Sequence, residues 1–165
     1  MNLTGIVDRL DSHKSQGVLY FEKGRLVRRD YPSVRKDVEK AIERLKGYGV
    51  KAGMRVGIRS SNCYPWIVYD LALLELRAVS IAFTEDFFPT SADELQERYK
   101  LGLLLAYSKD KPALETTKGF LALLDQEGGD GIKAIDTYEP EADPDFECPS
   151  LIFSSGTSGR VKGLR

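Results

Sequence analysis

The residues best suited to chemistry form a run of serine, threonine and glycine that ends in one lysine. Three apolar residues, Leu151 to Phe153, precede the run and predict a short buried strand. The run reads Ser154-Ser155-Gly156-Thr157-Ser158-Gly159-Arg160-Val161-Lys162-Gly163. Glycines let a chain fold back so that backbone N–H groups converge on an anion, and hydroxyl groups add neutral donors. Because the lysine adds a compact positive charge, this set of groups is suited to holding phosphates.

Two familiar nucleotide-binding patterns do not describe this loop. A Walker-type phosphate loop requires Gly-Lys-Ser/Thr, whereas Lys162 stands between Val161 and Gly163. The glycines also lack the spacing of a dinucleotide-binding fingerprint. A flexible Gly/Ser linker is the remaining alternative, but a linker does not need a preceding apolar strand or one placed lysine. The pattern therefore favours a phosphate-binding loop of another kind.

The loop resembles the signature loop of the adenylate-forming (AMP-binding) superfamily, which includes acyl-CoA synthetases, adenylation domains of peptide synthetases, and luciferases. It matches that signature at every position from Ser154 to Gly163 except Val161, where the family has Pro. A compatible Pro would restrict the loop before ligand binds, which stabilises by about 0.4–1 kcal/mol. Val161 does not restrict the backbone of the loop in this way, but it removes no phosphate contact. The likeness extends upstream to Asp30-Tyr31, Gly53-Met54-Arg55-Val56, Asn62 and Arg77-Ala78-Val79.

The resemblance implies a role for each residue of the loop. Its backbone would wrap the β- and γ-phosphates of ATP, its hydroxyls would donate hydrogen bonds, and Lys162 would be the catalytic cation that neutralises the departing pyrophosphate. Mg²⁺ would enter with ATP, and no residue of this chain is predicted to be a metal ligand. The predicted nucleotide-binding residues are Ser154, Ser155, Gly156, Thr157, Ser158, Gly159, Lys162 and Gly163.

The resemblance also implies a reaction and its partners. A carboxylic acid and ATP would give an acyl adenylate and pyrophosphate, and the acyl group would then pass to the thiol of CoA or of carrier-protein phosphopantetheine. The family's other motifs lie downstream of the position of Arg165. We therefore expect an N-terminal portion of such a ligase that is inactive by itself. Two alternatives stay open: an amino-acid-activating domain of a peptide synthetase, and a non-catalytic binding or interaction module.

Composition excludes several other classes of function. The 165 residues contain 24 Lys and Arg and 25 Asp and Glu, so no excess of positive charge favours nucleic acid as a partner. Cys63 and Cys148 lie far apart without a CxxC motif, which argues against a disulfide or zinc framework and fits the cytoplasm. The most apolar run, 67–83, is interrupted by Asp70, Glu75 and Arg77, so no membrane span is predicted.

Hydrophobic spacing and capping residues predict the order of the elements. Asp30 and Asn62 are each expected to cap a helix, and Ser91 opens a capping box. Helices are expected at 3–10, from Asp30 to about Leu45, and at 65–77, 91–100 and 114–124. Strands are expected at 17–21, 25–29, 55–58, 78–83, 103–106, 132–135 and 151–153.

This alternation predicts an α/β fold with a largely parallel sheet covered by helices on both faces. The final strand would deliver the phosphate loop at its carboxyl end, where such folds bind ligands. The resemblance implies the first subdomain of the large N-terminal domain of an adenylate-forming enzyme. We expect this α/β subdomain at 1–138, an acidic Pro-rich linker at 139–149, and the strand with its loop at 150–165. An exposed sheet edge could also support a homo-oligomer.

Overall fold

The computed structural model describes residues 5–84, 91–107, 116, 119–125, 132–135, 150–154 and 162–164. The helices are α1 (Ile6–Arg9), the short 3-10 helix η1 (Leu10–His13), α2 (Tyr31–Gly47), α3 (Tyr64–Glu75) and α4 (Ala92–Tyr99). The strands are β1 (Gly17–Glu22), β2 (Arg25–Asp30), β3 (Arg55–Arg59), β4 (Val79–Phe83), β5 (Leu103–Ala106), β6 (Leu121–Leu123), β7 (Ser150–Ser154) and β8 (Lys162–Leu164).

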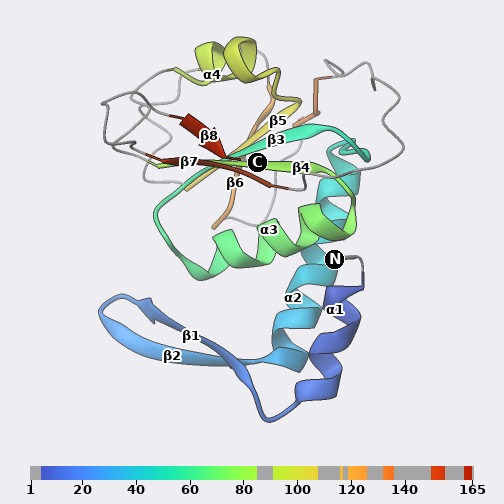
Figure 1. The fold of residues 1–165 in the computed structure, drawn as a ribbon, viewed down its shortest axis with the longest axis vertical. Coiled ribbons are helices and arrows are strands. Elements are labelled where there is room, and N and C mark those ends of the chain that lie inside the picture. The colour runs from blue at the N-terminus through green and yellow to red at the C-terminus, as the bar shows by residue number, and fades with distance from the viewer. Residues whose placement is uncertain are drawn as a thin grey trace.

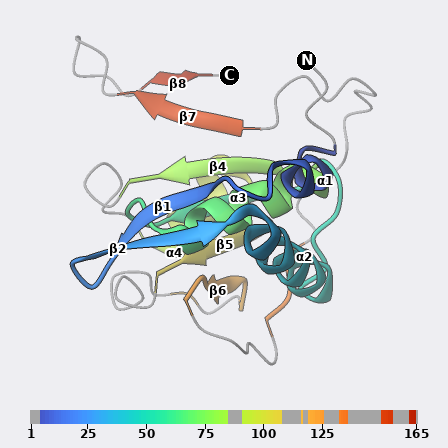
Figure 2. The ribbon, with the colours of Figure 1, turned by 90° about the horizontal axis from the view of Figure 1, so that it is seen from below.

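The main sheet is largely parallel. In the described residues its strand order is β6-β5-β3-β4-β7-β8, and every neighbouring pair from β6 to β7 is parallel. Only β8, at one edge, runs antiparallel to its neighbour β7. Strands β1 and β2 form a separate antiparallel hairpin. Figure 2 shows the parallel strands side by side, with β7 and β8 beyond β4.

Helices cover both faces of this sheet, as the sequence predicts. Figure 1 shows α4 on one side of the sheet, and α3 on the other side with α2 packed behind it. Strand β5 contributes to both cores because successive side chains of a strand point to opposite faces. Leu103 and Leu105 belong to the core beneath α2 and α3, whereas Leu104 and Ala106 belong to the core beneath α4.

At Gly57 the backbone of β3 closely approaches side chains of the core beneath α4. A Cβ atom added at Gly57, in the middle of β3, would lie 2.9 Å from carbon atoms of Leu101, Leu104 and Phe83. Contacts that short are sterically forbidden in a close-packed interior. A side chain at position 57 would therefore force the sheet and this core apart.

Two of the three predicted helix caps are confirmed. The Asp30 carboxylate accepts a hydrogen bond from the backbone N–H of Ser33 at 2.8 Å and caps α2. The Ser91 hydroxyl accepts from the backbone N–H of Glu94 at 3.3 Å and caps α4. The expectation for Asn62 is wrong, because α3 begins at Tyr64 and its N-cap is Cys63, without a side-chain cap. Since proline fits the first turn of a helix, α3 starts one residue before Pro65 and leaves Asn62 outside the cap.

Two predicted elements after residue 110 are wrong. The helix expected at 114–124 is replaced at 121–123 by β6, which pairs in parallel with β5. This apolar run is too short for periodicity to distinguish a strand from a helix, so pairing with β5 decides its structure. Residues 132–135 form no strand. Their backbone N–H groups bind scattered partners, with Ala134 donating to the Tyr48 carbonyl and Ile135 to the Gly102 carbonyl, both at 2.7 Å.

The elements near the two ends of the chain differ from those predicted. The first helix is split into α1 and η1, which together cover Ile6 to His13. Strand β8 was not predicted, because three residues are too few to show a pattern. The expected linker at 139–149 lies outside the described residues.

Candidate functional site

Strand β7 carries the start of the predicted phosphate loop to the carboxyl edge of the parallel sheet. β7 pairs with β4 in the register Ser80↔Ser150 and Ile81↔Leu151. It ends at Ser154, and β8 returns beside it in antiparallel register, with Ser154 opposite Lys162. The hairpin therefore brings the two ends of the predicted loop together (Figure 2).

The structure places three of the predicted binding residues in this framework. Ser154 is the last residue of β7, whereas Lys162 and Gly163 belong to β8. The remaining predicted residues, Ser155 to Gly159, lie outside the described residues. The individual roles of the loop residues stay predictions. The sequence did not indicate that Lys162 starts a strand, and no capping or turn signal marks that position.

Strand β3, which β4 separates from β7, ends in polar residues at the same edge, since the carboxyl ends of parallel strands lie together. Arg59, the last residue of β3, is only 5% exposed. The Ser60 hydroxyl donates to the Ser61 carbonyl at 2.7 Å and lies 3.2 Å from the Cys63 thiol. Helix α3 starts here, and its N-terminus adds positive potential to this edge of the sheet.

A cluster of one acid, one cation and one tyrosine holds the start of α3 in place. The Tyr64 hydroxyl donates to Asp37 Oδ2 at 2.6 Å, linking α3 to α2. Arg29 of β2 donates to both oxygens of the same carboxylate, at 2.9 and 3.0 Å. Burial, and then the hydrogen bond to Asp37, raise the pKa of Tyr64 above its ordinary range. The hydroxyl therefore stays protonated and continues to donate.

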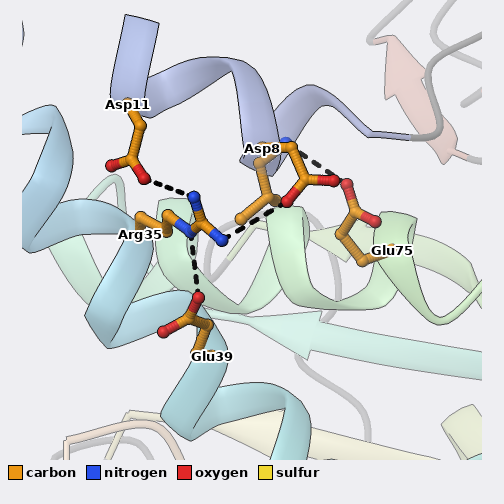
Figure 3. Close-up of polar contacts among 6 residues, drawn as sticks. Asp8, Asp11, Arg35, Glu39 and Glu75 are labelled. Atoms are coloured by element: carbon orange, nitrogen blue, oxygen red, sulfur yellow. Dashed lines mark hydrogen bonds and ion pairs between the residues drawn. The ribbon is translucent and has the colours of Figure 1, made fainter.

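A second group of polar contacts attaches α1 and η1 to α2 and to the C-terminal end of α3 (Figure 3). These contacts have a structural role. Arg35 of α2 lies among the carboxylates of Asp8, Asp11 and Glu39, with the Arg35–Glu39 contact at 2.9 Å. Glu75 accepts a hydrogen bond from the Val7 backbone N–H at 3.2 Å. Exposed ion pairs of this kind contribute little each, so the cluster chiefly orients α1.

Two further searches of the described residues give negative findings. His, Cys, Asp and Glu side chains there do not gather in groups of three or more that could hold a metal ion. No helix in that part of the chain has the length and apolar character needed to cross a bilayer.

Comparison with known proteins identifies what this fold resembles. A family model described as AMP-binding enzyme matches residues 10–164. A comparison with curated protein sequences finds no match. Among solved structures, the N-terminal subdomain of NpsA from Klebsiella oxytoca, in complex with 3-hydroxyanthranilyl-AMSN, superimposes with a TM-score of 0.69 at 14% identity. That match covers 99% of this chain and 40% of the NpsA chain.

Two other structures are similarly close. The anthranilate CoA ligase AuaEII, in complex with anthranoyl-AMP, has a TM-score of 0.71 at 19% identity, over 99% of this chain and 34% of its own. The McyG A-PCP protein, in complex with phenylalanyl-adenylate, has a TM-score of 0.69 at 19% identity, over 96% of this chain and 27% of its own. At these identities the likeness shows the fold, and this chain spans well under half of each protein. These matches do not support the expected homo-oligomer.

Proposed function

Because this chain belongs to the family of AMP-binding enzymes, we propose that it forms the N-terminal portion of an ATP-dependent carboxylic acid ligase. The observation that carries the proposal is the β7–β8 hairpin. It sets Ser154 opposite Lys162 at the carboxyl end of a parallel strand, where folds of this class bind ligands. The intervening residues have the hydroxyl, glycine and lysine content that phosphates require.

In this proposal the loop holds the β- and γ-phosphates of ATP. Backbone N–H groups from 155 to 159 converge on the phosphate oxygens. The hydroxyls that donate to those oxygens belong to Ser154, Ser155, Thr157 and Ser158. Lys162, fixed at the start of β8, supplies the positive charge. Mg²⁺ enters bound to ATP.

The proposed reaction has two steps. An oxygen of the substrate carboxylate attacks the α-phosphorus, the bond from that phosphorus to the bridging oxygen breaks, and pyrophosphate leaves. A carboxylate is a weak nucleophile, so positioning and neutralisation of charge on the leaving group supply the acceleration, and Lys162 contributes the second of these. A thiolate then attacks the acyl carbon, AMP leaves, and a thioester forms.

We propose that the sites that bind the acid and the thiol acceptor lie in parts of the ligase outside this chain. The similar structures include a CoA ligase and an A-PCP protein, so both CoA and a carrier-protein thiol remain candidate acceptors. The chain spans 34% of that CoA ligase and 27% of that A-PCP protein, and we propose that alone it does not form an adenylate. Cys63 is a free thiol, which fits our proposal of a reducing, cytoplasmic compartment.

The test is acid-dependent exchange of labelled pyrophosphate into ATP, with a panel of aliphatic, aromatic and amino acids. The assay uses the polypeptide isolated from its own cells, with its intact mass measured, beside the 165-residue chain. We expect exchange with at least one acid from a heavier native polypeptide and none from the shorter chain. A native polypeptide of 18.4 kDa without exchange would instead favour the non-catalytic interaction module.

A further inference from the structure

Strand β7, which carries the start of the phosphate loop, joins the parallel sheet through a short contact. β7 and β4 pair at two positions, Ser80↔Ser150 and Ile81↔Leu151, whereas β3 and β4 pair at five. Beyond its last pair with β4, strand β7 continues to Ser154. The position of the loop therefore depends on how firmly the first residues of β7 are held.

Ser80 lies at this contact and faces α3. Ile81 and Phe83 belong to the core beneath α4, so the alternation of side chains along β4 places Ser80 on the opposite face of the sheet. Ser150 is adjacent to Ser80 in register and lies on the same face. Ser80 is only 2% exposed, and its Oγ has no hydrogen-bond partner among the residues that the structure describes. A buried hydroxyl thus lies beside the start of β7.

A carboxyl group of α3 lies near this hydroxyl. Asp70 is half-buried, and burial raises the pKa of its carboxyl. The Ser80 hydroxyl lowers that pKa by less, as a hydroxyl close to a carboxylate does. Asp70, Ser80 and Ser150 therefore form a line of oxygen-bearing side chains that leads from α3 across β4 to β7.

This arrangement lowers the stability of the fold, which argues against a purely structural role. A buried hydroxyl without a hydrogen bond costs about 1–3 kcal/mol, and burial disfavours an ionised carboxyl. Alanine at position 80 would avoid the first cost, and Ala82 occupies the next position on the same face of β4. Polar residues that are kept at a cost to stability are typical of functional positions.

We propose that Ser80 and Asp70 are positioning residues for the phosphate loop, because together they hold the start of β7 in place. The inference rests on the proposed ligase function, since it concerns the loop that would bind ATP. In the proposed arrangement Asp70 accepts a hydrogen bond from Ser80, whose lone pairs then accept a hydrogen bond from β7. Neither side chain touches the nucleotide. They align β7 and so determine the affinity for ATP rather than the rate of the chemical step.

The test is pyrophosphate exchange by the native polypeptide at saturating acid and varied ATP. The variants are Ser80→Ala and Asp70→Asn, and the matched control is Asp93→Asn. Asp93 is also half-buried and accepts a hydrogen bond from the Thr116 hydroxyl at 2.7 Å, but its helix, α4, covers the other face of the sheet (Figure 1). Urea unfolding and hydrogen exchange of the β7 amides are measured on the same proteins.

We expect both variants to raise KM for ATP by about three- to tenfold and to leave kcat within about twofold, because binding rather than chemistry is affected. Neither variant should lower the free energy of unfolding, and the β7 amides should exchange hydrogen faster in both. The control should change KM by less than about twofold.

A purely structural role would give a different pattern. It would lower kcat in step with lost stability and leave KM unchanged, because fewer molecules would be folded. That pattern, or a KM that neither variant changes, would overturn the proposal. A wild-type protein without exchange would contradict the ligase function instead. In that case β7 amides that exchange equally in the wild type and both variants would also refute the positioning role.

Discussion

Lys162 is the residue whose replacement tests the nucleotide site most directly. Its position at the start of β8, opposite Ser154, fixes the closing end of the loop. We expect Lys162→Ala to lower the rate of pyrophosphate exchange by the native polypeptide about 10²–10³-fold, because one electrostatic contact to the leaving group is lost. The exposed Lys40→Ala on α2 is the control and should leave the rate unchanged. Full activity in Lys162→Ala would remove this residue from the mechanism.

Gly57 sets a limit on the packing of the core beneath α4. We expect Gly57→Ala to lower the free energy of unfolding by about 1–3 kcal/mol, because the new methyl group meets three core side chains at 2.9 Å. Gly47→Ala, at the end of α2, is the matched control, since nothing lies within 4 Å of its added Cβ. That change should be neutral or stabilise by about 0.5–1 kcal/mol. Urea unfolding of both variants measures the difference, and equal stabilities would contradict the packing argument.

Asp70 of α3 makes stability depend on pH. Burial raises the pKa of its carboxyl above the ordinary value of 3.8, and the nearby Ser80 hydroxyl lowers the pKa by less. A raised pKa means that the folded protein binds the proton more tightly than the unfolded chain, so stability is lost as pH rises through the folded pKa. Asp70→Asn should therefore stabilise the protein at pH 7, by an amount that shrinks as pH approaches 3.8.

The measurement for Asp70 is Tm as a function of pH for the wild type and for Asp70→Asn. The exposed Glu22→Gln on the hairpin is the control and should shift stability by less than about 0.5 kcal/mol at any pH. An advantage of Asp70→Asn that stays constant from pH 4 to 7 would show that burial of charge is not the cause.

At the scale of elements, one hydrogen bond joins α3 to Asp37 of α2, the same carboxylate that holds Arg29 of the β1–β2 hairpin. Tyr64→Phe keeps the ring that stacks on Tyr20 but removes the 2.6 Å hydrogen bond to Asp37. We expect it to lower the free energy of unfolding by about 1–3 kcal/mol, as for hydrogen bonds to charged groups. Backbone amides of β1 and β2 should also exchange hydrogen faster. Tyr31→Phe, whose ring also packs on the core, is the control, and matching losses in both variants would refute a specific role.

Elements were predictable where local rules decide them. Asp30 and Ser91 cap their helices as expected, because the cap needs only a side chain three residues before the N–H that it accepts from. The sequence predicts a helix where β6 forms, because the pairing of β6 with β5 is a long-range contact that residues 121–123 do not reveal. The sequence does not predict β8 either, because three residues are too few to show a pattern and the strand forms by pairing with β7.

At the scale of the whole molecule, alternation of strands and helices was enough to predict a parallel sheet covered on both faces. The order of the strands was not predictable, because nothing in β3 specifies that it lies between β5 and β4. The candidate site was likewise predictable in part. Residue types and spacing identify a phosphate loop at the end of β7, whereas the antiparallel return that sets Lys162 against Ser154 becomes visible only in the fold.

The order of the strands in the sheet also determines how long one edge of β4 stays unpaired during synthesis on the ribosome. Strand β4 pairs with β3 as soon as both have emerged, but its other partner, β7, follows about 65 residues later along the chain. At about 5–20 residues per second, that edge of β4 stays open for about 3–13 s. An open strand edge can recruit another nascent chain during this interval. The strand that delivers the phosphate loop is therefore also the one that closes this edge, so slow or interrupted translation before residue 150 should increase aggregation.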